Sequence, residues 1–222
     1  MVSNRIKLIA SLLSKSDKVL DVGTDHALLP IYLIKNDMVE LADASDISSN
    51  VLINAKNNLS KSNLSNKINL YLSDGLKSID VSRYNTLVIC GMGYYTIRDI
   101  LMDSNLETIN KMIIQTNNHY SDFRTFIVSI GYKIKEEIWI QDQGIDYLIF
   151  NIEKGLQKLS NEEIFCGVYN EKNIKYYENE IKKYEEVLKS IPNNLSNKIN
   201  DINIIVNIYK SYLSREKTEE KN

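Results

Sequence analysis

The stretch from Lys18 to Pro30 constrains the fold of this chain more than any other. It reads K-V-L-D-V-G-T-D-H-A-L-L-P. The apolar run 19–22 predicts a buried strand, Gly23 predicts a turn, and a helical pattern follows from about Asp25. A strand, a glycine turn and a helix N-terminus together present backbone N–H groups at one point. The chain is therefore expected to form an α/β unit with a ligand site after its first strand.

Asp21, inside the end of that strand, indicates the charge of the ligand. A carboxylate there would repel a dinucleotide pyrophosphate but suits a cation. Gly23 is also the one glycine of a G-x-G-x-x-G turn that is present, because the residues 24–27 after it are T-D-H-A. A cofactor with an ammonium or sulfonium group, such as S-adenosylmethionine, fits this turn better than NAD.

The rest of the first 155 residues alternates strand and helix patterns. Five strands that alternate with helices predict a doubly wound, Rossmann-like parallel sheet. A closing hairpin around Asp142-Gln143-Gly144 brings the sheet to seven strands and adds an antiparallel strand at one edge. The predicted strands are 18–22, 39–44, 68–72, 86–90, 112–115, 132–140 and 146–152, and the predicted helices are 3–14, 25–35, 48–61, 94–103 and 120–130.

Acidic residues follow three of these strands. Ligands of such sheets bind at the carboxyl ends of the strands, where Asp21, Asp46 and Asp74 are expected to lie. Asp46 is placed to accept hydrogen bonds from two ribose hydroxyls, and Asp74 to meet an adenine amino group. A dinucleotide site would explain Asp46 alone. The alternative is that each acid caps a helix. Capping could account for any one of the three acids, but it is a weaker explanation for all three together.

From Leu156 onward the pattern becomes purely helical. Apolar residues recur at alternating spacings of three and four on both sides of Pro192. This predicts an antiparallel coiled-coil hairpin and a division into residues 1–155 and 156–222. A plain packing or dimerising hairpin and an arm that grips a long substrate both remain open. The predicted seam comprises Ile174, Tyr177, Ile181, Tyr184, Leu188 and Ile191, then Ile199, Ile202, Val206, Tyr209 and Leu213.

Composition narrows the class of protein. No apolar run approaches the ~20 residues of a membrane helix, and the first seven residues lack the apolar stretch of a signal peptide. Cys90 and Cys166 lie far apart, without metal-type spacing. We therefore expect a cytoplasmic protein without disulfides, bound metal or membrane contact.

A net charge of −2 excludes general coating of nucleic acid, so RNA would have to meet a local basic patch. Such a patch would make RNA affinity fall with salt. The candidate contacts are Arg5, Lys7, Arg98, Arg124, Lys172, Lys175, Lys182 and Lys183.

Two segments make the chain resemble a known family. R-I-K-L-I-A at 5–10 and D-V-G-T-D-H-A-L-L-P-I-Y-L at 21–33 are similar to the bacterial tRNA (adenine-N1) methyltransferases that act on adenine 22. The similarity continues at 45–47, 74–76, 89–93, 113–115 and 146–147. It implies a class I methyltransferase fold with a C-terminal coiled coil. It also implies S-adenosylmethionine as cofactor, tRNA as partner and transfer to N1 of adenine 22, and we expect a monomer.

The positions of residues beside the expected cofactor, together with the resemblance, indicate the site residues. Asp25 and His26 are the catalytic candidates: one would hydrogen-bond the target adenine or take its N6 proton, unless Asp25 caps the helix and His26 packs. Arg5 and Tyr94 are the substrate-binding candidates, although the helix of Arg5 could be a plain packing helix. Those implied for the cofactor are Asp21, Gly23, Thr24, Asp46, Ile47, Asp74, Gly75, Gly91 and Met92.

The chain departs from the family pattern at the end of strand 86–90. Cys90 stands where the family has alanine, and Tyr94 replaces a glycine. Cytosine-C5 methyltransferases use a strand-four cysteine as nucleophile, but theirs follows proline, so Cys90 is expected to be a core residue. The absence of an Asn/Asp-Pro-Pro-Tyr motif there favours a ring nitrogen over N6.

Three other functions remain as alternatives. The chain could methylate another RNA position or a small molecule on the same fold. It could also be a non-catalytic binding module that keeps the cofactor fold. The exposed helical arm speaks against a small-molecule substrate, and the three strand-end acids speak against a scaffold.

Overall fold

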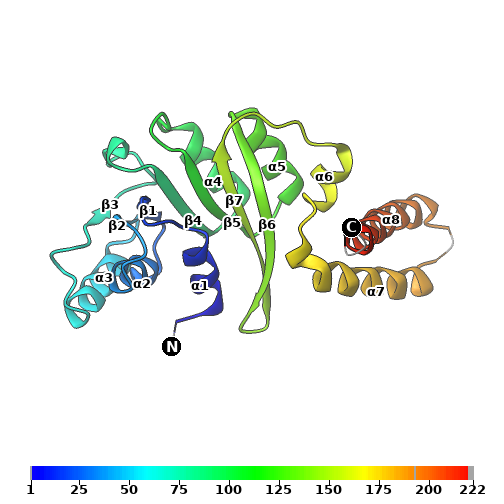
Figure 1. Cartoon of the computed structure of the whole chain (residues 1–222), viewed down its shortest axis with the longest axis horizontal. Helices are drawn as coiled ribbons and strands as arrows, with labels where there is room; N and C mark the ends of the chain where they lie inside the picture. Colours follow the sequence, from blue (N-terminus) through cyan, green and yellow to red (C-terminus); the bar gives the residue numbers. More distant parts are fainter. Residues whose placement is uncertain (1, 193, 220–222) are drawn as a thin grey trace.

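The computed structural model describes residues 2–192 and 194–219, with side chains as far as Arg215. Its centre is a seven-stranded sheet of order β3-β2-β1-β4-β5-β7-β6, as Figure 1 shows. Helices cover both faces. The strands are β1 Lys18–Val22, β2 Leu41–Asp46, β3 Leu70–Leu72, β4 Thr86–Met92, β5 Lys111–Thr116, β6 Tyr132–Asp142 and β7 Ile145–Lys154. The α-helices are α1 Asn4–Ser11, α2 Leu28–Lys35, α3 Ser49–Lys61, α4 Tyr94–Met102, α5 Tyr120–Ser129, α6 Asn161–Cys166, α7 Ile174–Ser190 and α8 Ser196–Glu219.

The apolar strands create two cores, one on each face of the sheet. Leu20, Leu87 and Ile114 face the side covered by α4 and α5. Val19, Val88 and Ile113 face α1 and α2. Strands β1, β4 and β5 are buried on both faces over most of their length, which is why they read as mainly apolar runs. The predicted α/β class and doubly wound sheet are confirmed.

The hairpin closes the sheet differently from the prediction. Strand β7 pairs antiparallel with both β5 and β6, so it is inserted between them and β6 forms the edge. Gln143 and Gly144 both have positive φ, as a two-residue hairpin turn requires. The antiparallel strand is thus second from the edge, and the edge strand runs parallel to β5.

Helix α2 starts three residues later than predicted. His26 and Ala27 have φ of 56° and 57°, in the left-handed region, so the helix begins only at Leu28. The amide of Asn58 on α3 donates to the His26 carbonyl at 3.1 Å and holds this turn. The segment 24–27 is therefore a separate loop between β1 and α2.

Beyond β7 the chain forms a helical hairpin at one end of the molecule (Figure 1). Helices α7 and α8 pack through Tyr177, Ile181, Val206 and Tyr209, all members of the predicted seam. The helical hairpin is confirmed, whereas supercoiling of its two helices stays a prediction. The structure adds the short helix α6, which sequence analysis missed.

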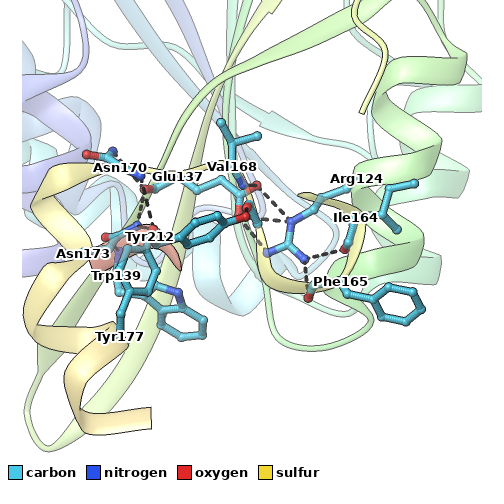
Figure 2. A network of polar contacts seen from close by, with 11 residues as sticks. Arg124, Glu137, Trp139, Ile164, Phe165, Val168, Asn170, Asn173, Tyr177 and Tyr212 are labelled. Atoms are coloured by element: carbon cyan, nitrogen blue, oxygen red, sulfur yellow. Dashed lines mark hydrogen bonds and ion pairs between the residues drawn. The ribbon is translucent and has the colours of Figure 1, made fainter. Parts of the chain in front are cut away.

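A buried ion pair lies where α6, the helix before this hairpin, meets α5 and the sheet. The guanidinium of Arg124 on α5 faces the carboxylate of Glu137 on β6, and the two side chains are 3% and 2% exposed (Figure 2). Arg124 also donates to the carbonyls of Ile164 and Phe165 on α6. Arg124 was a candidate RNA contact, and its burial in this pair corrects that interpretation.

The backbone carbonyl of Glu137 forms a second set of contacts, between β6 and the residues that precede α7. It accepts the side-chain amides of Asn170 and Asn173, at 3.0 and 2.7 Å. Asn173 also accepts the Trp139 N–H at 2.9 Å. These polar contacts position the start of α7 against the middle of β6.

Candidate active site

Asp21 occupies the centre of the carboxyl edge of the sheet. It lies on β1, between β2 and β4, where the strand order reverses direction. Its carboxyl group is 6% exposed and accepts the Thr24 hydroxyl at 2.5 Å. Burial raises its pKa to about 6, and the neighbouring charges of Asp25 and Asp46 act in the same direction. A carboxyl group whose pKa is raised this far loses its proton readily when a cationic ligand binds beside it.

The turn after Asp21 differs from the expected cradle of free N–H groups. The N–H groups of Gly23 and Thr24 both donate to the Ser45 carbonyl at 2.9 Å and extend the pairing of β1 with β2. Gly23 has φ +72°, and a Cβ there would collide with the Met92 methyl group. The glycine is therefore needed for its backbone conformation, whereas the Met92 methyl group ends a flexible side chain that can move away from a Cβ.

The other two strand-end acids occupy neighbouring positions along the edge. Asp46 ends β2, and its Oδ1 accepts the Ser48 N–H at 2.7 Å, which leaves Oδ2 without a partner among the described residues. Ile47, beside it, is exposed. Asp74 lies beyond β3 and pairs with Lys77 at 2.6 Å. Gly75, with φ +60°, packs against Ile100.

A polar network that sequence analysis missed lies on the opposite side of Asp21. Gln115 on β5 is buried, and its Oε1 accepts the Gly91 N–H at 3.0 Å and the Arg5 guanidinium at 3.4 Å. Its amide donates to Asn117 at 2.8 Å, and Asn117 donates to the Gly91 carbonyl. The positive φ of Gly91 and a register shift between Cys90 and Met92 allow this arrangement.

Arg5 is brought from α1 to the same point. Its guanidinium lies 4.6 Å from the ring centre of Tyr147 on β7. Its positive charge partly offsets the rise in the Asp21 pKa that burial causes. Of the predicted substrate residues, Arg5 therefore reaches the site. Its sequence signal was its place in a helix that precedes β1.

Asp25 and His26 lie at the mouth of the site. His26 Nε2 is 3.4 Å from Asp25 Oδ1, while its buried Nδ1 has no hydrogen-bond partner among the described residues. Helix α2 is preceded by Ala27, without a side-chain cap. The alternative that Asp25 caps this helix is therefore wrong, and the catalytic role of the pair stays a prediction.

Two adjoining hollows open beside these residues. A small one, of about 60 Å³, is lined by Arg5, Asp21, Gly23, Asp25 and Cys90, among others. A larger one, of about 600 Å³, lies between α1, α2 and the β6–β7 turn, and Arg5 and Asp25 line it too. The geometry thus offers a narrow pocket, with three charged side chains among mainly apolar ones, that continues into a cleft.

Tyr94 and Cys90 lie on either side of the Gly91–Gly93 turn. Tyr94 is buried, with its ring 6.2 Å from that of Phe126, and its role in substrate binding stays a prediction. Burial raises the pKa of the Cys90 thiol to about 12. A thiol that stays protonated is a poor nucleophile, which disfavours the cytosine-C5 mechanism.

Neither a membrane helix nor a metal cluster is found in the part of the chain that the structure describes. No helix there is long and apolar enough to cross a bilayer. No three acidic, histidine or cysteine side chains there are grouped so as to hold a metal ion.

Comparison with known proteins shows which family this chain belongs to. A family model described as "Methyltransferase domain" matches residues 2–150. The structure of M. capricolum TrmK, solved with S-adenosyl-homocysteine, is 32% identical with a TM-score of 0.78. The match covers 96% of this chain and 98% of that one. The chain belongs to the TrmK-like methyltransferase family.

Two further TrmK-like relatives extend the comparison. A Streptococcus pneumoniae structure, titled a putative tRNA (m1A22) methyltransferase, has a TM-score of 0.85 at 28% identity and covers 96% of this chain and 100% of that one. It has also been solved with S-adenosyl-L-methionine. The Bacillus subtilis tRNA (adenine(22)-N(1))-methyltransferase is 28% identical over 156 residues, which are 69% of this chain and 66% of that protein. The chain thus spans just under two thirds of this relative.

Proposed function

We propose that this protein transfers the methyl group of S-adenosylmethionine to N1 of adenine 22 in tRNA. The observation that carries the proposal is the buried carboxylate of Asp21 beside the Gly23 turn, at the point where the strand order reverses. The names of the TrmK-like relatives support the choice of reaction and substrate.

The residues present fit this cofactor. Asp21 and the free oxygen of Asp46 supply acceptors for its ammonium group and ribose hydroxyls. The hydroxyl of Ser45, the residue before Asp46 on β2, is buried and has no partner among the described residues. Ile47 offers an apolar surface next to Asp46. The cofactor supplies the electrophilic methyl group. The remaining implied contacts are Gly23, Thr24, Asp74, Gly75, Gly91 and Met92.

The protein's own task is to orient the target base. Adenine N1 has an in-plane lone pair and needs no activation, so positioning can supply roughly 7–11 kcal/mol of barrier lowering. The ring gains positive charge as N1 is methylated. The carboxylate of Asp25 would stabilise this charge or accept the N6 proton, and His26 would orient it. Arg5 would contact the base from the α1 side and Tyr94 from the β4 side.

The remaining assignments follow from the same proposal. Residues 1–155 would form the catalytic domain and 156–222 a coiled-coil arm that grips the tRNA. We expect a cytoplasmic monomer that uses no metal. Target adenines are normally stacked and paired, so the base must be flipped out before methylation.

In vitro methylation tests the proposal. The protein is incubated with labelled S-adenosylmethionine and unmodified bulk tRNA, and the digested nucleosides are identified. Label in 1-methyladenosine is the expected result, and mapping must place it at position 22. Label in another nucleoside would keep the cofactor but overturn the target. Binding of the cofactor without any label would favour a small-molecule substrate.

A further inference from the structure

Exposed rings lie just outside the candidate active site, at the starts of α4 and α5. Tyr95 is 53% exposed, and the centre of its ring is 5.3 Å from that of His119, at 61°. The Arg98 guanidinium lies 5.2 Å from the Tyr95 ring centre. We call Tyr95, His119 and Arg98 the aromatic rim.

The fold fixes the aromatic rim at the carboxyl edge of the sheet. Tyr95 follows β4 and His119 follows β5, which are neighbouring strands. The Asn117 N–H donates to the Met92 carbonyl at 2.9 Å, and the Asn118 side chain accepts the Tyr94 N–H at 3.0 Å. These bonds tie the two strand ends together. The rim is therefore carried by ordered backbone beside the Gly91–Gly93 turn.

The orientation of the His119 ring is also set. Its backbone has φ 54°, in the left-handed region, and its Nδ1 lies 3.0 Å from Asp122 Oδ2. Neither of the two hollows next to Asp21 is lined by Tyr95 or His119. The rim thus does not line the methylation pocket, and it lies along the same carboxyl edge of the sheet, after β4 and β5.

We propose that the aromatic rim stacks against an unpaired base that flanks the target adenine of the tRNA. This inference rests on the proposed function. When an adenine is flipped out, its neighbour in the strand loses a stacking partner. Aromatic rings and the guanidinium plane of arginine are the groups on which proteins stack unpaired RNA bases. Tyr95 and Arg98 offer both kinds of plane next to the pocket that receives the flipped base.

Steady-state kinetics with unmodified tRNA test the rim. Tyr95→Ala should raise KM for tRNA by about 5- to 150-fold, the loss typical of one stacked base. Tyr95→Phe keeps the ring and should stay near wild type, and the affinity for S-adenosyl-homocysteine should be unchanged in both. Ile53→Ala, which trims an equally exposed side chain on α3, is the matched control. An unchanged KM in Tyr95→Ala would overturn the proposal.

A fluorescent RNA separates this inference from the proposed function. 2-Aminopurine replaces the nucleotide next to the target adenine, and stacking quenches its fluorescence. Quenching by the wild type that is lost in Tyr95→Ala supports the rim, whereas equal quenching by both proteins refutes it. If the wild type methylates no tRNA, the proposed function is wrong, and this fluorescence difference still decides whether the rim stacks on RNA.

Discussion

Replacing Arg124 by methionine should destabilise the protein strongly. The substitution removes three hydrogen bonds to the Glu137 carboxylate, of 2.7 to 3.1 Å, and two to carbonyls of α6. Glu137 would keep the Val168 N–H, at 3.2 Å, as a side-chain partner. Removing one member of a buried ion pair leaves the other charge uncompensated and costs about 3–5 kcal/mol. Such a loss is a large part of a total stability of about 5–15 kcal/mol.

Urea denaturation and thermal melting measure this loss. A change of 3–5 kcal/mol corresponds to a Tm lower by roughly 6–20 °C in a chain of this size. The control is the double variant Arg124→Met/Glu137→Leu, which removes both charges and should recover most of the stability, because the Asn170 and Asn173 contacts use the Glu137 carbonyl and survive. A single variant that loses less than about 1 kcal/mol would refute the argument, since the pair would then be solvated or dispensable.

The candidate active site gives three further predictions. Asp21 binds its proton more tightly when folded, with a pKa of about 6 against 3.8, so the cofactor-free protein should lose roughly 3 kcal/mol as pH rises from about 4 to 6. Asp21→Asn should remove this pH dependence of Tm and weaken cofactor binding. Cys90→Ala should retain methylation, and a folded but inactive variant would revive the nucleophile hypothesis. Asp25→Asn should lower kcat by about 10²–10⁴ with normal cofactor affinity, and normal turnover would exclude its proposed role.

The sequence predicted the sheet because its inner strands are continuous apolar runs. It also carried a signal for the order of the last two strands. The β7 residues 147–152 are nearly all apolar, as in an interior strand, whereas β6 includes Lys133 and Lys135, charges typical of an edge. The prediction overlooked this difference, because a hairpin alone leaves open which of its strands pairs with β5.

The start of α2 was beyond local sequence reasoning. Left-handed φ is uncommon for any non-glycine residue, although histidine adopts it more often than most, so the pair His26-Ala27 does not by itself indicate a loop. The Asn58 amide on α3 and the complete burial of Ala27 stabilise this conformation. Both contacts depend on the folded arrangement of α2 and α3. The predicted helix start at Asp25 failed because a tertiary contact overrides the apolar periodicity.

Gln115 and Arg5 show the same limit within the candidate active site. Their side chains meet although 110 residues separate them, and no periodicity or motif relates the two positions. Gln115 sits in an apolar strand, where a buried amide needs partners. A glutamine in an apolar strand is therefore the sequence signal that could have identified Gln115 as a site residue. Its partner is the Gly91 N–H, which the turn conformation of Gly91 leaves available.

The Arg5 guanidinium links the two halves of the site. Toward β1, its charge favours the ionised form of Asp21, the form that we propose receives the cofactor's ammonium group. Toward β5, it donates to Gln115, and Tyr147 covers its plane. Arg5 is held there because α1 buries Ile9 and Ala10 against the sheet. The N-terminal helix is therefore part of the candidate active site: undocking it would remove the cation that favours Asp21 ionisation and one wall of the cleft beside Asp25.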